Sequence, residues 1–288
     1  MLRSMFRSHA KIRAMFSSRS ARLLSALAVV VLLFQVTALA QASQPETKPP
    51  APDSARTGVP VLIELFTSEG CSSCPPADVV LQKLDQYQPI PGAQLIVLSE
   101  HVTYWDHDGW KDPNSAQAFT DRQSSYETAL GVKEPYTPQF IIDGTQIGQI
   151  DKLQELEQEL NKAKDDTKLP VRIGEVTLDP SNPAVLKTHI ETDANPDRHN
   201  ADVYVALVLD HVESQVLRGE NGGKHLVHVA VVQQLTKVGK LSKGKSFAQD
   251  VQLKLKPGDY PKNLRLVVFV QESGPGKLLG AAMRKPIL

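Results

Sequence analysis

The sequence has very little cysteine: Cys71 and Cys74 are the only two in 288 residues. So few cysteines exclude a small fold held together by several disulfide bonds. A structural zinc site needs four ligands, and no second C-x-x-C pair is present to complete one. A disulfide between residues so close in the chain closes a very short loop and constrains the unfolded chain little. The spacing therefore favours a redox role for the pair, with an inert disulfide or part of a metal site as alternatives.

The first 40 residues lack acidic side chains and contain six basic ones. An apolar stretch follows at residues 23–34, and Ala38 and Ala40 then form a small-x-small pattern. This order predicts a secretory signal peptide over residues 1–40. The alternative is an uncleaved anchor, because the 18 residues of 23–40 approach the length of a membrane-spanning helix. In both cases we expect the rest of the chain to be exported, either periplasmic or secreted.

The sequence also lacks an excess of positive charge. It contains 32 basic and 32 acidic residues, and taking away residues 1–40 leaves 26 basic against 32 acidic. A nucleic-acid-binding protein normally shows the opposite bias, so we expect no nucleic-acid partner. The expected partner is an exported protein substrate or redox partner, and a membrane only if the N-terminal segment stays uncleaved. We expect no cofactor.

Residues 41–58 contain four prolines and no large apolar side chain, which predicts a disordered linker. Residues 59–168 alternate short apolar runs with helical patterns. Residues 169–288 contain only strand-like runs, separated by Gly, Pro, Asn and Asp. We therefore predict an α/β domain over 59–168, followed by an all-β sandwich domain over 169–288.

Within residues 59–168 the predicted order is β-α-β-α-β-β-α. Residues 61–66 and 94–100 are short apolar runs, as in strands buried on both faces, and a helical pattern follows each. Gly131 is a predicted helix C-cap, and Asp143-Gly144 predicts a hairpin. Asp151 is a predicted N-cap of the last helix, whose apolar stripe is Leu153, Leu156 and Leu160.

Three features in order resemble a thioredoxin fold: a strand, then Cys71-Ser72-Ser73-Cys74 before a helix, and Thr137-Pro138 before the third strand. More closely, the segments "ELFTSEGCSSCPPAD", "HVTYWDHDGWKDP", "RQ", "YTPQFIIDG" and "GENGGKHLVHVAVV" resemble secreted proteins of the domain-of-unknown-function 1223 family. The resemblance extends over nearly all of residues 59–288. It implies a thioredoxin-like fold and a cis peptide bond before Pro138, and it brings no established reaction.

The cysteine pair has the spacing needed for thiol–disulfide exchange, in which one thiolate attacks and a second resolves the mixed disulfide. Cys71 is the predicted nucleophile, because the first cysteine is expected to be exposed near the helix start, and Cys74 is the predicted resolving residue. Pro75 and Pro76 move the helix start toward Pro76, which weakens the dipole effect on Cys71.

Several residues around the pair are candidates for supporting roles. Glu64 interrupts an apolar strand, so its carboxyl is expected to be buried with a raised pKa and to accept the proton of Cys74. The alternative is that Glu64 is paired or reaches the edge of the sheet. Thr137 and the loop residues Tyr104, Trp105 and Asp106 are predicted to bind substrate, since loops at this end of a sheet often carry function. Ordinary packing of these aromatic side chains is the alternative.

Two other classes of function stay open. Thiolates with an imidazole suit copper(I) or zinc, so Cys71, Cys74 and His101 form an alternative metal site for a metal-delivery protein. A non-catalytic binding module, in which the β-sandwich binds a partner, is the second alternative.

Overall fold

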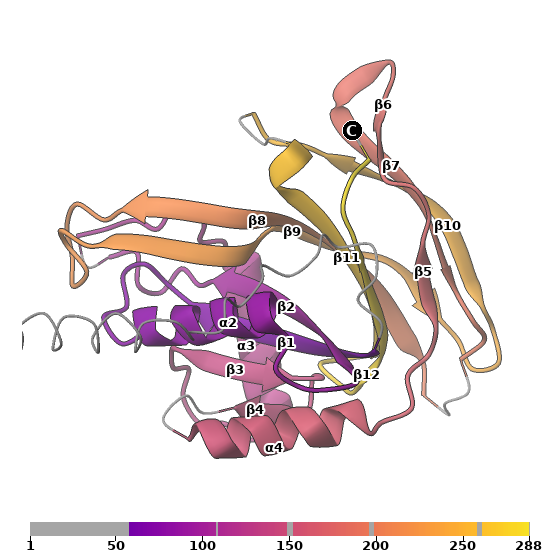
Figure 1. Cartoon of the computed structure of the whole chain (residues 1–288), viewed down its shortest axis with the longest axis horizontal. Coiled ribbons are helices and arrows are strands. Elements are labelled where there is room, and N and C mark those ends of the chain that lie inside the picture. The colour runs from indigo at the N-terminus through magenta and orange to yellow at the C-terminus, as the bar shows by residue number, and fades with distance from the viewer. Residues whose placement is uncertain (1–57, 108, 149–151, 196–198, 258–260, 288) are drawn as a thin grey trace, which may run out of the picture. The chain divides into compact units, whose positions relative to one another are not determined.

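The computed structural model describes residues 58–107, 109–148, 152–195, 199–257 and 261–287 (Figure 1). The predicted signal peptide and nearly all of the predicted linker lie outside these residues. The described residues up to 168, which we call the first half, contain three helices, α2 (Pro75–Tyr87), α3 (Gln117–Leu130) and α4 (Leu153–Lys164). Its strands are β1 (Val59–Thr67), β2 (Ala93–His101), β3 (Gln139–Ile142) and β4 (Gln146–Gly148).

The rest of the described chain consists of strands and one short 3₁₀ helix, η1 (Pro261–Asn263). The strands are β5 (Val171–Ile173), β6 (Thr177–Asp179), β7 (Asn182–Thr192), β8 (Ala201–Gln215), β9 (His225–Leu241), β10 (Phe247–Lys254), β11 (Leu264–Glu272) and β12 (Leu278–Arg284). The fold is therefore mixed α/β, with strands predominating.

One large mixed sheet joins strands from both halves of the chain, in the order β12-β11-β8-β9-β2-β1-β3-β4. Strands β1 and β2 are parallel, whereas β3 is antiparallel to both β1 and β4. The junction between the halves is a short parallel contact of β2 with β9, where Ser99 lies opposite Val231. The β8–β9 hairpin therefore continues the sheet directly beside the strands that lead to the cysteine pair.

A second, antiparallel sheet has the order β10-β7-β5, and β6 also pairs with β7. Its apolar side chains, such as Leu186 and Val251, share a hydrophobic core with side chains of β8 and β11. A separate core lies under the helices and includes Leu62, Leu81 and Phe269. Both cores thus contain residues of the large sheet, which is the element common to the whole described fold.

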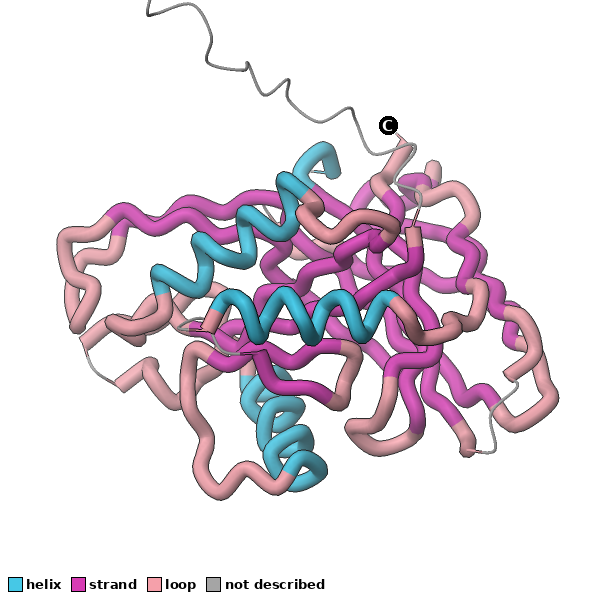
Figure 2. Tube along the Cα trace, turned by 60° about the horizontal axis from the view of Figure 1, so that its bottom comes forward, coloured by secondary structure: helices cyan, strands magenta, loops and turns pink. Residues whose placement is uncertain are grey.

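Helices cover both faces of the β1–β4 part of the large sheet. Thr67 on β1 contacts Asp78 on α2, whereas Glu64 contacts Arg122 on α3, and residues 64 and 67 of a strand point to opposite faces. Side chains of α2 and α4 line one shared groove, so these helices lie side by side, as Figure 2 shows. α2 and α4 therefore cover one face and α3 the other.

The local predictions for the first half are confirmed in their order, β-α-β-α-β-β-α. Gly131 ends α3 in a left-handed conformation, and Asp143 and Gly144 both have positive φ in the β3–β4 hairpin. The stripe prediction for α4 is partly wrong, because 56% of Leu153 is exposed while Leu156 and Leu160 are buried. The predicted cap Asp151 lies outside the described residues.

The strands after residue 168 differ in two ways from a separate all-β sandwich. Residues 171–179 divide into two strands, β5 and β6, and β8, β9, β11 and β12 belong to the sheet of the first half. The division into domains at residues 168 and 169 stays a prediction. Among the described residues, no helix combines the length and apolar character needed to cross a membrane.

Candidate functional site

Cys71 and Cys74 form a disulfide bond at the point where β1 leads into α2. α2 begins at Pro75, one residue before the predicted start, and Cys74 is its N-cap. The carbonyl oxygen of Cys74 accepts hydrogen bonds from the amides of Ala77 and Asp78, at 2.8 and 3.2 Å. The second cysteine is thus part of the first helical turn, whereas Cys71 lies in the preceding loop.

Both cysteines are fully buried, with exposures of 0%. The expected exposure of Cys71 is therefore wrong for the disulfide form. Ser72 and Ser73, between the cysteines, are exposed. Three neighbouring segments of the chain contact the loop that contains the cysteines.

The loop before β3 is the first of these neighbours. The Thr137–Pro138 peptide bond is cis, as predicted. The Ser73 hydroxyl donates to the carbonyl oxygen of Thr137 at 3.4 Å and lies 3.3 Å from the sulfur of Cys71. Ser73 therefore links the first cysteine to the segment before the proline.

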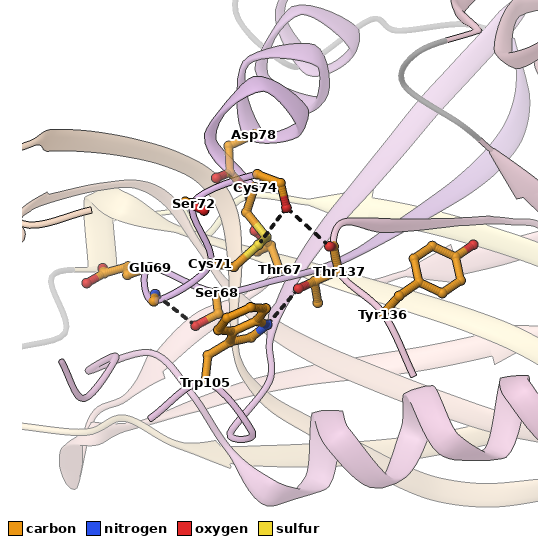
Figure 3. The surroundings of a disulfide bond; sticks show 12 residues. Thr67, Ser68, Glu69, Cys71, Ser72, Cys74, Asp78, Trp105, Tyr136 and Thr137 are labelled. Carbon is orange, nitrogen blue, oxygen red and sulfur yellow. Dashed lines mark hydrogen bonds between the residues drawn. A yellow bond between two sulfur atoms is a disulfide. The ribbon is translucent and has the colours of Figure 1, made fainter. Parts of the chain in front are cut away.

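The loop after β2 is the second neighbour. The indole N–H of Trp105 donates to the Thr137 hydroxyl at 2.7 Å, a contact that Figure 3 shows beside the disulfide. A Cβ atom at position 70 would lie only 3.0 Å from Trp105, so a larger residue there would require Trp105 to shift. The loop thus lies beside the cysteine pair, as predicted, and its role in binding substrate stays a prediction.

Two other residues of the loop after β2, Tyr104 and Asp106, contact neighbouring residues of the protein. Tyr104 packs against the buried cluster that includes Phe66 and Tyr126, and burial raises the pKa of its hydroxyl to about 12. Asp106 accepts hydrogen bonds from the Asp112 amide at 3.2 Å and the Ser115 hydroxyl at 2.8 Å. Both are therefore placed to shape the loop.

A buried group that we call the histidine cluster lies beside α2 and consists of Glu69, Asp78, His101, Asp112 and His228. None of these five residues is more than 5% exposed. His101 Nδ1 lies 2.7 Å from Asp112 Oδ2, and the His101 and His228 rings meet edge to face with centroids 4.8 Å apart. His228 lies 3.6 Å from Asp78 and 3.8 Å from Glu69. The cluster brings together the end of β2, the segments that follow β1 and β2, the first turn of α2 and strand β9.

The two closest members of the histidine cluster have shifted pKa values. Burial opposes protonation of His101, but the charge of Asp112 and its hydrogen bond outweigh burial, so the pKa of His101 is raised. Burial likewise opposes ionisation of Asp112, yet His101 and the amides of Glu69 and Asn114 hold its pKa at about 2. The two side chains therefore form a buried ion pair at acidic to near-neutral pH.

A second buried group, the arginine cluster, lies beside α3 and consists of Glu64, Glu100, Arg122, Tyr126 and Gln271. Arg122 donates to Glu64 at 2.5 Å and to Gln271 at 3.2 Å, and the Tyr126 hydroxyl donates to Glu64 at 2.5 Å. Burial tends to raise the pKa of Glu64, but Arg122 outweighs burial and the pKa is lowered. The predicted raised pKa is therefore wrong, and the alternative of a paired carboxylate is confirmed. Burial and the charge of Glu64 raise the pKa of Glu100.

A third neighbour of the disulfide comes from far along the chain. The loop between β8 and β9, residues 216–224, contacts the backbone of the cysteine loop through two side chains. The Ser72 amide donates to the Glu220 carboxylate at 3.0 Å. The Asn221 side-chain amide donates to the carbonyl oxygens of Glu69 and Cys71, at 2.8 and 2.9 Å, and Asn221 is fully buried.

The sequence contained signals for some of these residues without assigning roles to them. Arg122 and Gln123 are the "RQ" pair of the family resemblance, and Glu220 and Asn221 belong to "GENGGKH". Gln123 donates to the Tyr136 carbonyl at 2.8 Å and so supports the segment before Pro138. Asp112 lies in the segment "HVTYWDHDGWKDP" of the family resemblance, and no role was assigned to it there.

The alternative metal ligands are not assembled in this structure. Across the described ranges, no group of three or more His, Cys, Asp or Glu residues is placed to hold a metal ion. Cys71 and Cys74 are bonded to each other, and the His101 ring contacts Asp112. No observation on these residues favours the metal-delivery alternative.

Comparisons with known proteins find a matching family and a similar crystal structure. The family model described as "Protein of unknown function (DUF1223)" matches residues 62–271. An X-ray crystal structure of a protein from Agrobacterium tumefaciens is similar at 27% identity and a TM-score of 0.63, covering 81% of this chain and 97% of that one. No curated protein matches.

A domain of the outer membrane lipoprotein Omp28 from Porphyromonas gingivalis is much less similar. Its identity is 14% and its TM-score 0.27, over 42% of this chain and 88% of that domain. A score this low carries no argument about the fold.

Proposed function

The chain belongs to the DUF1223 family, whose description assigns no activity, and we propose that it is an exported thiol–disulfide oxidoreductase acting on protein substrates. The observation that carries this proposal is the disulfide at the start of α2, linked through Ser73 to the cis-proline segment. Cys71 is the nucleophile and Cys74 the resolving residue.

A thioredoxin-like arrangement of residues 59–168, with a β-sandwich formed by later strands, is part of the proposal. The strand order β2-β1-β3-β4, with β1 and β2 parallel and β3 antiparallel to both its neighbours, supports it. So does the placement of α2 and α4 on one face and α3 on the other. In such a sheet the site lies beyond the carboxyl end of β1, where the cysteines are.

In the reducing direction, the Cys71 thiolate attacks a substrate disulfide and displaces one substrate thiolate, which takes up a proton. The Cys74 thiol then loses its proton and attacks the Cys71 sulfur, and the second substrate thiol leaves. The substrate gains two electrons and two protons, and the pair ends as the disulfide seen here. The oxidising direction is the reverse of these steps.

Trapping of mixed disulfides tests the assignment of the two cysteines. With Cys74→Ser, a mixed disulfide on Cys71 has no resolving thiol and should accumulate as bands that a reductant removes. Cys71→Ser should trap far less, because Cys74 lies in the first helical turn. The substrate in the first instance is insulin, and the readout is non-reducing electrophoresis.

The outcomes separate the candidate functions. Equal trapping by both variants would cancel the roles of Cys71 and Cys74. Absence of trapping and of insulin reduction, together with stoichiometric copper(I) binding by the reduced wild type, would replace the proposal with metal delivery.

A further inference from the structure

The β8–β9 loop, residues 216–224, has a defined structure of its own. The Val216 amide donates to the Lys224 carbonyl at 3.0 Å, and the Gly223 amide donates back to the Val216 carbonyl at 2.8 Å. Gly219 and Gly223 have φ values of 77° and 85°, which non-glycine residues rarely adopt. The loop therefore presents its central residues in a fixed arrangement.

Two of these central residues hold the backbone on both sides of Cys71. Asn221 binds the carbonyl oxygens of Glu69 and Cys71, and Glu220 binds the amide of Ser72. Lys224 donates to the Asn221 side-chain oxygen at 2.8 Å, which fixes the orientation of that amide. Three successive parts of the disulfide loop are thus held by a segment about 150 residues away in sequence.

We propose that residues 216–224 form a cover on the disulfide loop, and that Glu220 and Asn221 are positioning residues that limit access of a thiol to Cys71. Both sulfurs are fully buried while the cover is in place. Because both sulfurs are buried, an attacking thiolate reaches Cys71 only after the cysteine loop or its neighbours move. Each hydrogen bond to the backbone of the cysteine loop opposes the movement. This proposal concerns regulation of the site and rests on the proposed function only for its biological meaning.

The chemical step that measures access is reduction of the disulfide by a small neutral dithiol such as dithiothreitol. Its thiolate attacks the Cys71 sulfur, a mixed disulfide forms, and the Cys71–Cys74 bond breaks with its electron pair leaving on Cys74, which takes up a proton. The second thiolate of the reagent then displaces Cys71. The reagent ends as a cyclic disulfide and the protein as two thiols.

Three variants separate hydrogen bonding from charge. Glu220→Ala removes the acceptor for the Ser72 amide, and we expect reduction to become about fivefold faster, as for loss of one hydrogen bond of ordinary strength, because this contact is exposed to solvent. Glu220→Gln keeps an acceptor oxygen and removes the charge, so its rate should stay within about twofold of wild type. Glu213→Ala on β8 is the matched control, because it removes an acid of the same hairpin that contacts His211 and His225 instead.

The readout is the fraction of alkylated cysteines against time, measured by mass spectrometry on the full exported chain. Amide hydrogen exchange at Ser72 is the second measurement and should be faster in Glu220→Ala alone. A wild-type rate for Glu220→Ala, or equal acceleration by Glu220→Ala and Glu220→Gln, would overturn the cover. If the variants show the expected rates but the wild type does not reduce insulin, the proposed oxidoreductase activity is overturned and the proposed cover is supported.

Discussion

Two buried polar clusters lie close to β1, and they handle charge in different ways. In the arginine cluster beside α3, the Glu64 carboxylate receives hydrogen bonds from Arg122 and Tyr126. In the histidine cluster beside α2, Asp112 faces His101, whose charge depends on pH. An arginine stays charged at all physiological pH values, whereas an imidazole does not. The first cluster is therefore suited to holding a fixed structure, and the second can respond to pH next to the cysteine pair.

The largest expected effect is the loss of Arg122. Arg122→Ala leaves the buried Glu64 and Glu100 without their cation, and it should lower the free energy of unfolding by about 4 kcal/mol. Urea titration followed by circular dichroism measures the change. Arg172→Ala is the control, because Arg172 forms ion pairs with Glu191 and Asp193 on the surface, where solvent screens them, so its loss should be much smaller than that of Arg122→Ala. Equal losses in the two variants would contradict the structural role of the arginine cluster.

The next effect concerns Glu100, whose pKa in the folded protein is raised by burial and by the charge of Glu64. As the pH rises above the usual value of 4.5, the unfolded chain loses this proton while the folded chain keeps it, so the wild type loses stability. Glu100→Gln removes this loss, so its free energy of unfolding should gain about 1.4 kcal/mol relative to wild type for each pH unit above that value, up to the folded pKa. Urea titrations over a series of pH values measure the difference, and a constant difference would contradict the raised pKa.

A smaller effect is expected for Asp112→Asn, which removes the partner of His101. The lowered pKa of Asp112 adds stability above its usual value of 3.8, and this is lost as the pH falls toward about 2. The raised pKa of His101 adds stability below 6.5, and this is lost as the pH rises through the folded pKa. The free energy of unfolding of the variant should therefore fall most, by about 2 kcal/mol, between pH 3.8 and pH 6.5.

The matched control for Asp112→Asn is Asp250→Asn. Asp250 faces His189 at 2.6 Å on the surface of the second sheet, so solvent screens the pair and the loss should be much smaller than for Asp112→Asn at every pH. Unfolding free energies of both variants from pH 3 to pH 9 test the window. A loss for Asp112→Asn that does not vary with pH would show that its charge is unimportant.

The smallest expected effect is that of Glu64→Gln on the cysteines. Because Arg122 keeps Glu64 ionised, we expect it not to exchange protons with Cys74, and the rate of disulfide reduction should stay within about twofold of wild type. Alkylation kinetics of the folded variant measure the rate. A rate of reduction at least tenfold lower than that of wild type would show that Glu64 acts in the redox chemistry of the cysteines.

Local sequence patterns were enough for the elements of the first half and for the position of its disulfide. Asp143-Gly144 predicts a hairpin because both residues tolerate positive φ, and Gly131 predicts a helix end for the same reason. The position of Cys71 and Cys74 at the start of a helix is predicted because an apolar run precedes them and a helical pattern follows. These predictions depend on residues within one or two turns of each other, so distant parts of the chain do not alter them.

The tertiary structure decided the properties of the site that depend on contacts between distant residues. Apolar runs predict that β9 is a strand, but they do not predict that it pairs with β2 and brings His228 behind the cysteines. Burial alone suggested a raised pKa for Glu64, and only the position of Arg122, 58 residues later, reversed it. The exposure of Cys71 was likewise decided by Asn221 and the loops around it. Burial, pairing and access arise from side chains brought together by folding, and a pattern in the sequence records only one partner of each contact.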